Sequence, residues 1–246
     1  AGPRLTSLLA ARQPPPIQMA AVTALAQFRE PEAARALVQD WSQLTPQLRS
    51  EALSSFVARP QQIPVLFDSI ENNAILRTEL SPAQAALLRA HRDQTLRQRA
   101  ATVLPDRKSE DREKVLQQFM SSLNLGGDAA RGRKIYLERC LSCHRSGGDG
   151  FAVGPDFTSV QSSGKEKLLT SIIDPNREVA PSYLNYVIDT KDGDSLMGLI
   201  VSDSGAGVTL RRAFGDESVV PRTGIQRIQS SRLSVMPEGL EATLSP

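Results

Sequence analysis

The sequence predicts an α+β protein, with a helical N-terminal part built as a short α-solenoid and a mixed C-terminal part that contains a small antiparallel β-barrel. Three observations predict this class. Apolar residues recur at helical spacing through residues 1–122, the period changes to two after residue 183, and turns rich in Gly and Asp separate the short stretches that follow. We therefore expect domains at 1–122 and 123–246, with the barrel inserted at about 183–230.

Composition places the chain among globular proteins and excludes several classes. Of the 246 residues, 40% are hydrophobic and 23% are charged, which is typical of a folded domain. The net charge is only +2, so the chain lacks the strongly basic character of a nucleic-acid-binding protein. The longest apolar runs, such as LMGLIV at 196–201, are too short to span a bilayer. The sequence therefore predicts neither a nucleic-acid partner nor a membrane span.

Residues 1–122 contain a series of helical stretches, most of which begin on or beside proline. Proline suits the first turn of a helix because its missing N–H needs no partner there. The first stretch, at 15–30, places Ile17, Ala21, Leu25 and Phe28 on one apolar stripe. Further stretches begin at residues 31, 45, 60, 81 and 95.

A short pattern repeats along these helices. AAVTAL at 20–25 is echoed as SEALSSF at 50–56 and, less clearly, as RAATVL at 99–104. Such spacings are typical of paired-helix repeats, which must stack on their neighbours to bury their apolar faces. The segment resembles degenerate HEAT-type repeats, and an irregular helical bundle is the alternative. The charged stretch at 105–114 and the loop NLGGD at 124–128 mark the expected domain boundary.

The C-terminal part begins with helices and continues with strands. DAARGRKIYLERC at 128–140 and KEKLLTSIIDP at 165–175 have helical patterns, and five strand-like stretches follow from residue 183. KDGD at 191–194 is typical of a hairpin turn. Because five short strands in an open sheet leave two unpaired edges, we expect a closed or nearly closed barrel.

Residues 139–148, RCLSCHRSGG, contain both cysteines of the chain and one of its two histidines. A structural zinc site needs four protein ligands, and the other histidine, His91, lies in the helical part. A dithiol redox motif normally follows a strand in an alternating βαβ unit, whereas Cys140 follows a predicted helix. Both chemistries therefore fit this chain poorly, although each uses C-x-x-C.

The third use of C-x-x-C is covalent haem attachment, which requires the pentapeptide C-x-x-C-H found at 140–144. Thiols three positions apart, here Cys140 and Cys143, reach the two vinyl groups of the porphyrin and become thioethers. The next residue, His144, is then directed at the iron. We predict one haem c held by these three residues, with zinc binding and dithiol redox chemistry as the alternatives.

A second axial ligand for the iron has to come from a methionine or from His91. Met19 and His91 lie in the helical part, Met120 occupies an apolar helical position, and Met197 lies in a predicted strand. Met236 lies in the irregular loop SVMPEGL, which the following proline stiffens. We predict Met236 as the second ligand; an open site, another ligand or a purely structural methionine are the alternatives.

The surroundings of the motif resemble class I cytochromes c. Gly132 and Tyr136 precede it as in the first helix of that class, and VGPDF at 153–157 is similar to its Gly-Pro turn. This resemblance implies that the Pro155 carbonyl accepts a hydrogen bond from Nδ1–H of His144, which fixes the tautomer of the ring. An ordinary turn is the other interpretation of this stretch.

Residues 128–246 resemble the haem-binding domain of Planctomycete/Verrucomicrobium-type cytochromes. The similar stretches are GRKIYLERCLSCH, GPDFT, LLTSIIDPNREVAPSYLNYVIDTKDG, VTLRRAFGD and SVMPEGLEATL. The resemblance implies a class I-like cytochrome c domain, interrupted by the small barrel and preceded by HEAT-like repeats. In that family the repeats follow a propeller similar to sugar dehydrogenases, which is not among these residues. Arg177 and Tyr183, in PNREVAPSY, are candidates for contacts with the haem propionates.

The predicted function is electron transfer without catalysis. The chain would accept electrons from a dehydrogenase domain or partner and pass them to another redox protein. One alternative is a haem peroxidase or ligand-binding sensor with an open distal site, and another is a HEAT-type interaction scaffold. Because covalent haem assembly takes place outside the bacterial cytoplasm, the expected compartment is the periplasm.

Overall fold

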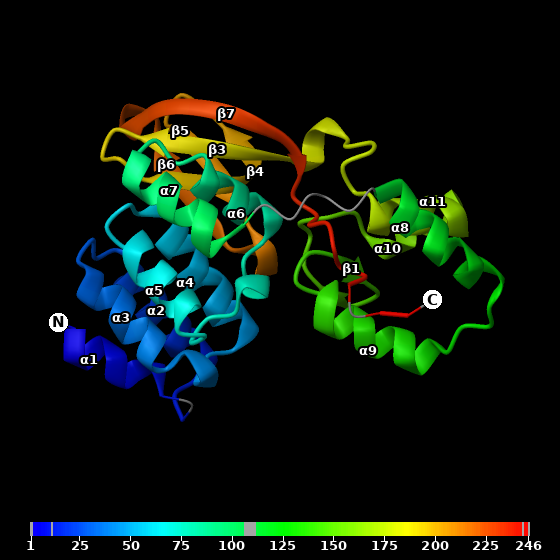
Figure 1. The fold of residues 1–246 in the computed structure, drawn as a ribbon, viewed down its shortest axis with the longest axis horizontal. Helices are drawn as coiled ribbons and strands as arrows, with labels where there is room; N and C mark the ends of the chain where they lie inside the picture. Colours follow the sequence, from blue (N-terminus) through cyan, green and yellow to red (C-terminus); the bar gives the residue numbers. More distant parts are fainter. Residues whose placement is uncertain (1, 11, 106–111, 243, 246) are drawn as a thin grey trace. The chain divides into compact units, whose positions relative to one another are not determined.

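The computed structural model describes residues 2–10, 12–105, 112–242 and 244–245, and most of the charged stretch 105–114 lies outside this range. The fold combines helices and one larger sheet (Figure 1). Two compact units are present. The helical unit comprises residues 1–105 and 188–196, and the second unit comprises 106–187 and 197–246. The predicted boundary at residue 123 stays a prediction.

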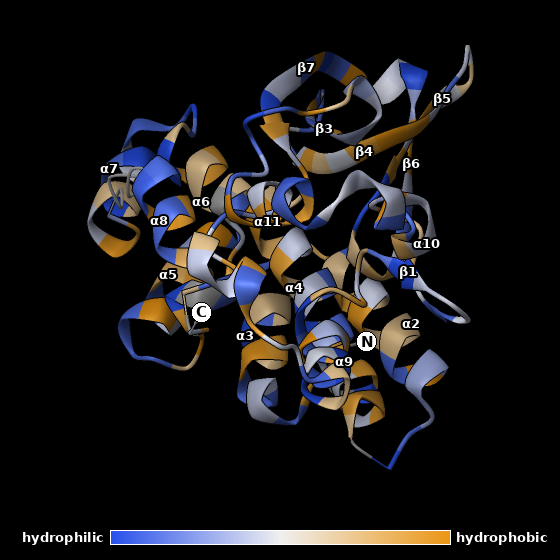
Figure 2. Ribbon diagram, turned by 90° about the vertical axis from the view of Figure 1, so that its right-hand side faces the viewer, coloured by the Kyte–Doolittle hydropathy of each residue, from blue (hydrophilic) through white to orange (hydrophobic). Residues whose placement is uncertain are grey.

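The helical unit consists of short helices around one apolar core. Its α-helices are α1 (Gly2–Thr6), α2 (Pro15–Ala26), α3 (Pro31–Gln39), α4 (Pro46–Ala58), α5 (Ile63–Glu71), α6 (Pro82–Arg89) and α7 (Gln94–Val103). Figure 2 shows hydrophobic and hydrophilic residues alternating along α3, α4 and α5. Phe56 and Phe67 are fully buried in this core, and Trp41, the only tryptophan, is 4% exposed. The assignment of these helices to HEAT-like repeats stays a prediction.

Proline occupies the first position of several of these helices, as the sequence indicated. Pro15, Pro31 and Pro46 each occupy the first helical position, where their fixed φ is already helical. Ahead of α4, the Thr45 hydroxyl accepts a hydrogen bond from the Leu48 N–H at 3.4 Å. This N-cap satisfies one of the donors that a helix start leaves without an intrahelical partner.

The predicted stripe on α2 is wrong at its two ends. Ile17 and Phe28 are 41% and 37% exposed, whereas Gln18 is buried. The Gln18 amide donates to the carbonyls of Leu9 and Ala10 at 2.9 and 3.1 Å. These hydrogen bonds compensate for the burial of the amide, and the helix is rotated so that a glutamine takes the place expected for isoleucine.

In the part of the second unit that the structure describes, four α-helices and a two-stranded hairpin accompany the larger sheet. They are α8 (Arg112–Phe119), α9 (Ala129–Arg139), α10 (Phe157–Val160), α11 (Lys165–Ile173), β1 (Arg145–Ser146) and β2 (Asp149–Gly150). Helices α8 and α11 pack through Val115, Leu116 and Ile173 (Figure 1). Pro175 follows α11 closely, as expected of a residue that cannot continue a helix.

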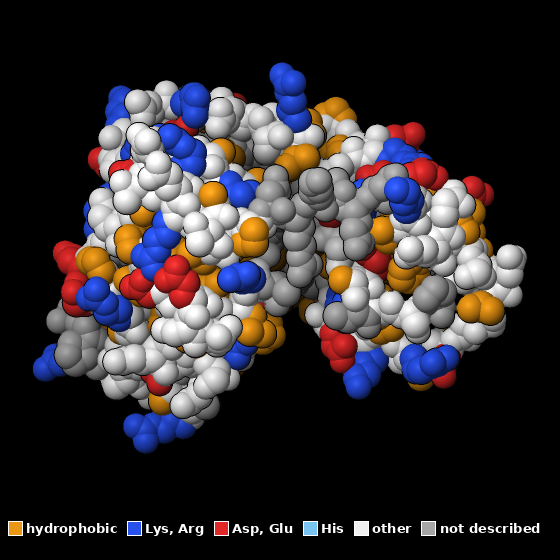
Figure 3. Space-filling view, in the orientation of Figure 1, with side chains coloured by type: hydrophobic (Ala, Val, Ile, Leu, Met, Phe, Trp, Pro, Cys, Tyr) orange, Lys and Arg blue, Asp and Glu red, His pale blue; other side chains and the backbone are white. Residues whose placement is uncertain are grey.

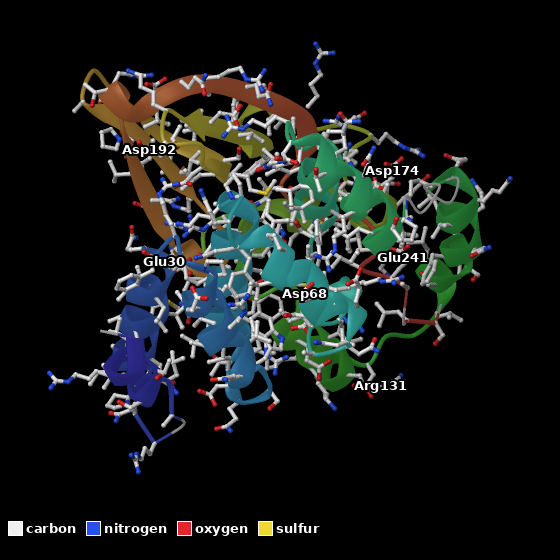
Figure 4. All side chains as sticks on the ribbon, turned by 60° about the vertical axis from the view of Figure 1, so that its left-hand side comes forward. Glu30, Asp68, Arg131, Asp174, Asp192 and Glu241 are labelled. Atoms are coloured by element: carbon white, nitrogen blue, oxygen red, sulfur yellow. The ribbon has the colours of Figure 1, made fainter. Side chains whose placement is uncertain are left out.

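A buried ion pair ties α8 to the C-terminal segment. Arg112 donates to the Ile173 carbonyl and, at 2.7 Å, to Oε1 of Glu241, which is labelled in Figure 4. The two side chains are 12% and 7% exposed. A buried charge of this kind is tolerated only with a partner, so the segment around Glu241 has a fixed place on this unit.

Five strands form one antiparallel sheet in the order β6-β5-β4-β3-β7. They are β3 (Leu184–Thr190), β4 (Ser195–Asp203), β5 (Gly207–Arg211), β6 (Glu217–Pro221) and β7 (Ile225–Ser234). All five lie where alternation predicted strands, and β7 extends further than expected. The predicted hairpin turn is present between β3 and β4, with Gly193 at φ +94° and its N–H bonded to the Thr190 carbonyl.

The expectation of a closed or nearly closed barrel is wrong, because β6 and β7 lie at opposite edges of the sheet. Closure is one way to remove edges, and short strands, proline and charged residues are others. Strand β6 is five residues long, begins at Glu217 and ends at Pro221, which has no N–H to offer. Strand β7 carries Arg227 and Arg232. An open sheet is therefore compatible with these edge sequences.

The tip of the β3–β4 hairpin belongs to the helical unit. Arg29 forms an ion pair with Asp194 at 3.0 Å and donates to the Asp192 carbonyl at 3.1 Å. Arg92 donates to the Gly193 carbonyl at 2.9 Å. Asp192 is labelled in Figure 4. Two arginines from separate helical segments therefore hold one turn.

Charge is evenly distributed on the visible surface. Figure 3 shows Lys and Arg side chains interspersed with Asp and Glu, in keeping with the small net charge. Within the described ranges, no helix combines the length and the apolar character that a membrane crossing would require.

Candidate cofactor-attachment site

A capped helix leads into the C-x-x-C-H motif. The Asp128 carboxylate accepts hydrogen bonds from the first N–H groups of α9, at 2.9 Å from Ala130 and 3.0 Å from Arg131. The helix ends at Arg139, directly before the motif. The Cys140 carbonyl then accepts from the N–H groups of Cys143 (3.0 Å) and His144 (2.9 Å). One compact backbone turn therefore carries both thiols and the imidazole.

The two thiols lie in a partly apolar environment. Cys140 and Cys143 are half-buried and form no disulfide. Burial raises the pKa of both thiols, and for Cys143 the Ser142 hydroxyl, 3.7 Å from Sγ, opposes the increase. Reactive redox dithiols have lowered pKa values, so this environment argues against dithiol redox chemistry. Among the described residues, no group of three or more Cys, His, Asp or Glu could hold a metal ion.

The His144 ring is fixed through one of its nitrogens. Its Nδ1 lies 2.7 Å from the Pro155 carbonyl oxygen, which is the hydrogen bond implied by the resemblance to class I cytochromes c. Because a carbonyl only accepts, Nδ1 carries the proton and Nε2 retains its lone pair for a metal. Gly154 lies against the ring, since a Cβ there would be 2.4 Å from Cε1 of His144. These two contacts hold the imidazole in one orientation.

The loop after the motif returns to the motif itself. The Cys143 carbonyl accepts hydrogen bonds from the N–H groups of Val153 (3.0 Å) and Gly154 (2.7 Å). The Tyr136 hydroxyl donates to the carbonyls of His144 (2.9 Å) and Asp149 (3.2 Å). Tyr136 therefore links α9 to the residue before β1 and to the first residue of β2.

Aromatic packing completes the support of His144. The Phe157 ring lies 5.1 Å from the His144 ring and 5.3 Å from the Tyr136 ring, measured between centroids. Such distances are typical of aromatic pairs. Sequence reasoning did not assign a role to Phe157, although it follows the quoted Gly-Pro-Asp stretch directly.

The turn between β5 and β6 also contacts the motif. The Phe214 N–H donates to the Ser142 carbonyl at 2.6 Å, and the Phe214 ring meets Phe151 edge-on with centroids 5.7 Å apart. Arg211 donates to the Ala152 carbonyl at 3.1 Å. No local pattern indicates this contact, because the turn is distant from the motif along the chain.

Packing reduces the number of candidates for a second iron ligand. Met19 packs against the core of the helical unit, and Met120 packs against the apolar cluster of α8 and α11, as its apolar helical position predicted. Met197 lies in β4. Met236 lies outside the regular elements, is half-buried, and donates its N–H to the Ser234 hydroxyl at 3.1 Å. Of these four methionines, only Met236 is in a loop of the second unit.

Arg177 and Tyr183, the residues predicted to meet the propionates, have other partners in the structure. The Arg177 guanidinium pairs with Glu113 at 2.5 Å and with Asp174 at 3.0 Å. The Tyr183 carbonyl accepts from the Val235 N–H at 3.1 Å. Their contacts with propionates stay predictions.

Asn176, beside Arg177, was not singled out by sequence reasoning. Its side-chain Oδ1 accepts from the Ser234 N–H at 2.8 Å, and its Nδ2 donates to Glu238 at 2.5 Å. Asparagine is common in turns, so the sequence alone did not distinguish this role.

Comparison with known proteins agrees with the geometry of the site. Residues 129–192 match the family model described as Cytochrome c. No curated protein resembles the chain closely enough to count as a relative. The matched segment includes Cys140, Cys143 and His144, and it supports a haem-binding cytochrome c domain, whose cofactor is covalently bound haem c.

Proposed function

We propose that the chain is an electron-transfer protein, because residues 129–192 match cytochrome c and such a domain carries covalently bound haem c. The hydrogen bond between His144 Nδ1 and the Pro155 carbonyl carries this proposal. It leaves Nε2 available as an iron ligand, on the same turn as two thiols that form no disulfide. This donor set fits haem c and falls short of the four protein ligands of structural zinc.

Each residue of the motif has a separate task in this proposal. Cys140 and Cys143 hold the cofactor through thioethers, and His144 is the axial ligand. The bound haem supplies one-electron chemistry through its iron. Pro155 keeps the imidazole in one tautomer, and Gly154 gives the ring room to stand where it does.

Met236 is the proposed second axial ligand. Arg139, which directly precedes Cys140, donates to the Leu240 carbonyl at 2.8 Å. Met236 lies four residues before Leu240, so the chain keeps the Met236 Cα within about 14 Å of the Leu240 Cα. A thioether ligand favours ferrous iron and raises the reduction potential. Two protein ligands would also leave no open position for a substrate, which favours electron transfer over catalysis.

The proposed partners follow from this role. We propose that the electron donor is a dehydrogenase, either a further domain or a separate protein, and that the acceptor is another redox protein. The periplasm is the proposed compartment, since covalent haem attachment requires the maturation machinery found there. The resemblance to Planctomycete/Verrucomicrobium-type cytochromes supports both proposals.

Visible spectroscopy on the full chain, produced with haem-maturation machinery, tests the function. We expect haem that remains bound in acidified acetone, and a weak far-red charge-transfer band in the ferric protein, which marks His/Met ligation. Met236→Ala should lose this band, whereas the control Met197→Leu should keep it. Haem that extracts into the acetone would contradict covalent attachment.

Carbon monoxide binding distinguishes electron transfer from a peroxidase or a ligand sensor. The reduced wild-type protein should bind it slowly because Met236 occupies the iron, and Met236→Ala should bind it rapidly. Rapid binding by the wild type, together with retention of the band in Met236→Ala, would exclude this ligand. That result would support a peroxidase or a ligand sensor.

A further inference from the structure

The loop that carries Met236 is held on both sides by one side chain. Oδ1 of Asn176 accepts from the Ser234 N–H at 2.8 Å, and Nδ2 of Asn176 donates to Oε1 of Glu238 at 2.5 Å. Ser234 lies two residues before Met236, and Glu238 lies two residues after it. Asn176 therefore spans the short stretch on which the methionine stands.

The chemistry of these partners fixes the orientation of the amide. A backbone N–H can only donate and an ionised carboxylate can only accept, so Asn176 must present oxygen to Ser234 and nitrogen to Glu238. Aspartate would lose the donor and bring a second negative charge to Glu238. Alanine would lose both bonds. Among side chains of this length, only asparagine offers a donor and an acceptor on one carbon.

Asn176 is itself held in place. It follows Pro175, which is buried, at the turn after α11. The same turn is closed by a hydrogen bond from the Arg177 N–H to the Asp174 carbonyl at 3.2 Å. An ion pair between Arg177 and Glu113 also connects this turn to α8, so Asn176 joins the Met236 loop to a turn that contacts both α11 and α8.

The Met236 loop has two further anchors. Val235 donates to the Tyr183 carbonyl at 3.1 Å. Further on, the buried pair of Arg112 and Glu241 fixes the chain at 2.7 Å. Asn176 binds Ser234, next to the Val235 anchor, and Glu238, between Met236 and the Glu241 anchor. Its loss therefore leaves both anchors in place and frees the stretch that follows Met236.

We propose that Asn176 is a positioning residue that presents Met236 to the haem iron. This inference rests on the proposed function, in which Met236 is the axial ligand. A thioether binds iron weakly, so an ordered loop reduces the entropy lost when the bond forms. Without Asn176 the loop samples more conformations, and the iron spends more time without its sulfur ligand.

The test uses Asn176→Asp in the matured full chain. Loss of the hydrogen bonds around a metal ligand commonly weakens its interaction by about ten- to hundredfold. We therefore expect carbon monoxide to bind the ferrous variant about tenfold faster than wild type, with a weakened far-red band in the ferric form. Haem attachment should be unchanged, because Asn176 contacts the Met236 loop and not the C-x-x-C-H turn. Asn124→Asp, the same change at an exposed residue of the second unit, is the matched control.

A double variant separates positioning from general damage. In Asn176→Asp combined with Glu238→Gln, the donor and the acceptor are exchanged, because the glutamine amide can donate to the new carboxylate. We expect the far-red band and slow carbon monoxide binding to return. If Asn176→Asp fails to fold, Glu238→Ala removes one of the two bonds from the other side and should accelerate binding to a smaller extent.

The outcomes distinguish this inference from the proposed function. If Met236→Ala loses the band while Asn176→Asp retains both the band and slow carbon monoxide binding, the ligand assignment stands and the positioning role is excluded. If Met236→Ala retains the band, the ligand assignment fails and the role of Asn176 fails with it. Acceleration in Asn176→Asp that the double variant does not reverse would also exclude positioning by these two hydrogen bonds.

Discussion

The N–H of Phe214 donates a 2.6 Å hydrogen bond to the carbonyl of Ser142, a residue that lies between the two cysteines of the motif. Phe214 has φ +62°, in the left-handed region that residues other than glycine seldom occupy. The strain is compensated by this hydrogen bond and by the packing of the ring on Phe151. The turn between β5 and β6 thereby supports the haem-attachment loop.

Because of this conformation, glycine should destabilise the protein less than alanine when it replaces Phe214, although alanine is normally the less destabilising of the two. Phe214→Ala and Phe214→Gly both lose the ring, but only glycine removes the left-handed strain, which costs about 1–2 kcal/mol for other residues. We expect Phe214→Gly to be more stable than Phe214→Ala by about 1 kcal/mol. Urea unfolding followed by haem absorbance measures this difference. An alanine variant at least as stable as the glycine variant would contradict it.

Gly154→Ala should disturb the imidazole directly. The added Cβ would lie 2.4 Å from Cε1 of His144, a distance that forces the ring to move. Since the Pro155 hydrogen bond depends on the position of the ring, we expect weaker axial ligation and a shifted Soret band. Gly126→Ala is a suitable control, because the described residues place no heavy atom within 4 Å of its added Cβ. An unchanged spectrum for Gly154→Ala would show that the ring has room.

Gly132→Ala should have the opposite effect on stability. Gly132 lies inside α9, and apart from its chain neighbours and the backbone of the helix itself, no heavy atom of the described residues comes within 4 Å of the position of its Cβ. Alanine is favoured over glycine in a helix by about 0.5–1 kcal/mol. We therefore expect the free energy of unfolding of the second unit to rise by about that amount. A decrease, measured by urea unfolding, would show that another group packs against this face of α9.

The pH dependence of the helical unit should follow His91. This side chain is 7% exposed, and its Nδ1 accepts from the Asp93 N–H at 3.0 Å. Burial lowers the pKa of His91, with Arg92 and Arg97 acting in the same direction and Asp93 against it. The unfolded chain, in which the imidazole has its ordinary pKa of about 6.5, therefore takes up a proton first as the pH falls.

The free energy of unfolding of the helical unit should therefore decrease in acid. The stabilising contribution is fully present above about pH 6.5 and decreases below it, by at most about 1.4 kcal/mol per pH unit. Trp41 fluorescence reports unfolding of the helical unit, since it is the only tryptophan. His91→Asn keeps an acceptor but does not titrate, so its unfolding should lose this pH dependence. A variant with the same pH profile as wild type would exclude His91 as the source.

Local signals in the sequence predicted much of the fold. Proline at the first turn located α2, α3 and α4, because the restriction on φ acts within one residue. Alternation and the Lys-Asp-Gly-Asp turn located β3 and β4 for the same reason. Whether the sheet closes depends on how distant strands associate, and the alternation of residues along each strand does not determine this. The rotation of α2 likewise depended on Gln18 meeting carbonyls at the end of another element.

The candidate site likewise contains some residues that the sequence predicted and others that it did not. Cys140, Cys143 and His144 lie within five consecutive residues, so the motif can be recognised from the sequence alone. The cytochrome c match supports its interpretation. The Pro155 contact was implied by resemblance and is present. Asn176 and Phe214 act through partners far away along the chain, and their residue types are common in turns and cores. Only the folded structure brings them to the loops that they hold.

The hairpin held by Arg29 and Arg92 limits how the protein can be divided. Residues 188–196 group with the helical unit although the chain on either side of them belongs to the other unit. The helical unit is thus discontinuous, and no single cleavage of the backbone can release either part whole. Separate expression of the cytochrome segment would leave this turn without its hydrogen bonds to Arg29 and Arg92. Such an experiment must therefore either redesign the turn or keep both units in one chain.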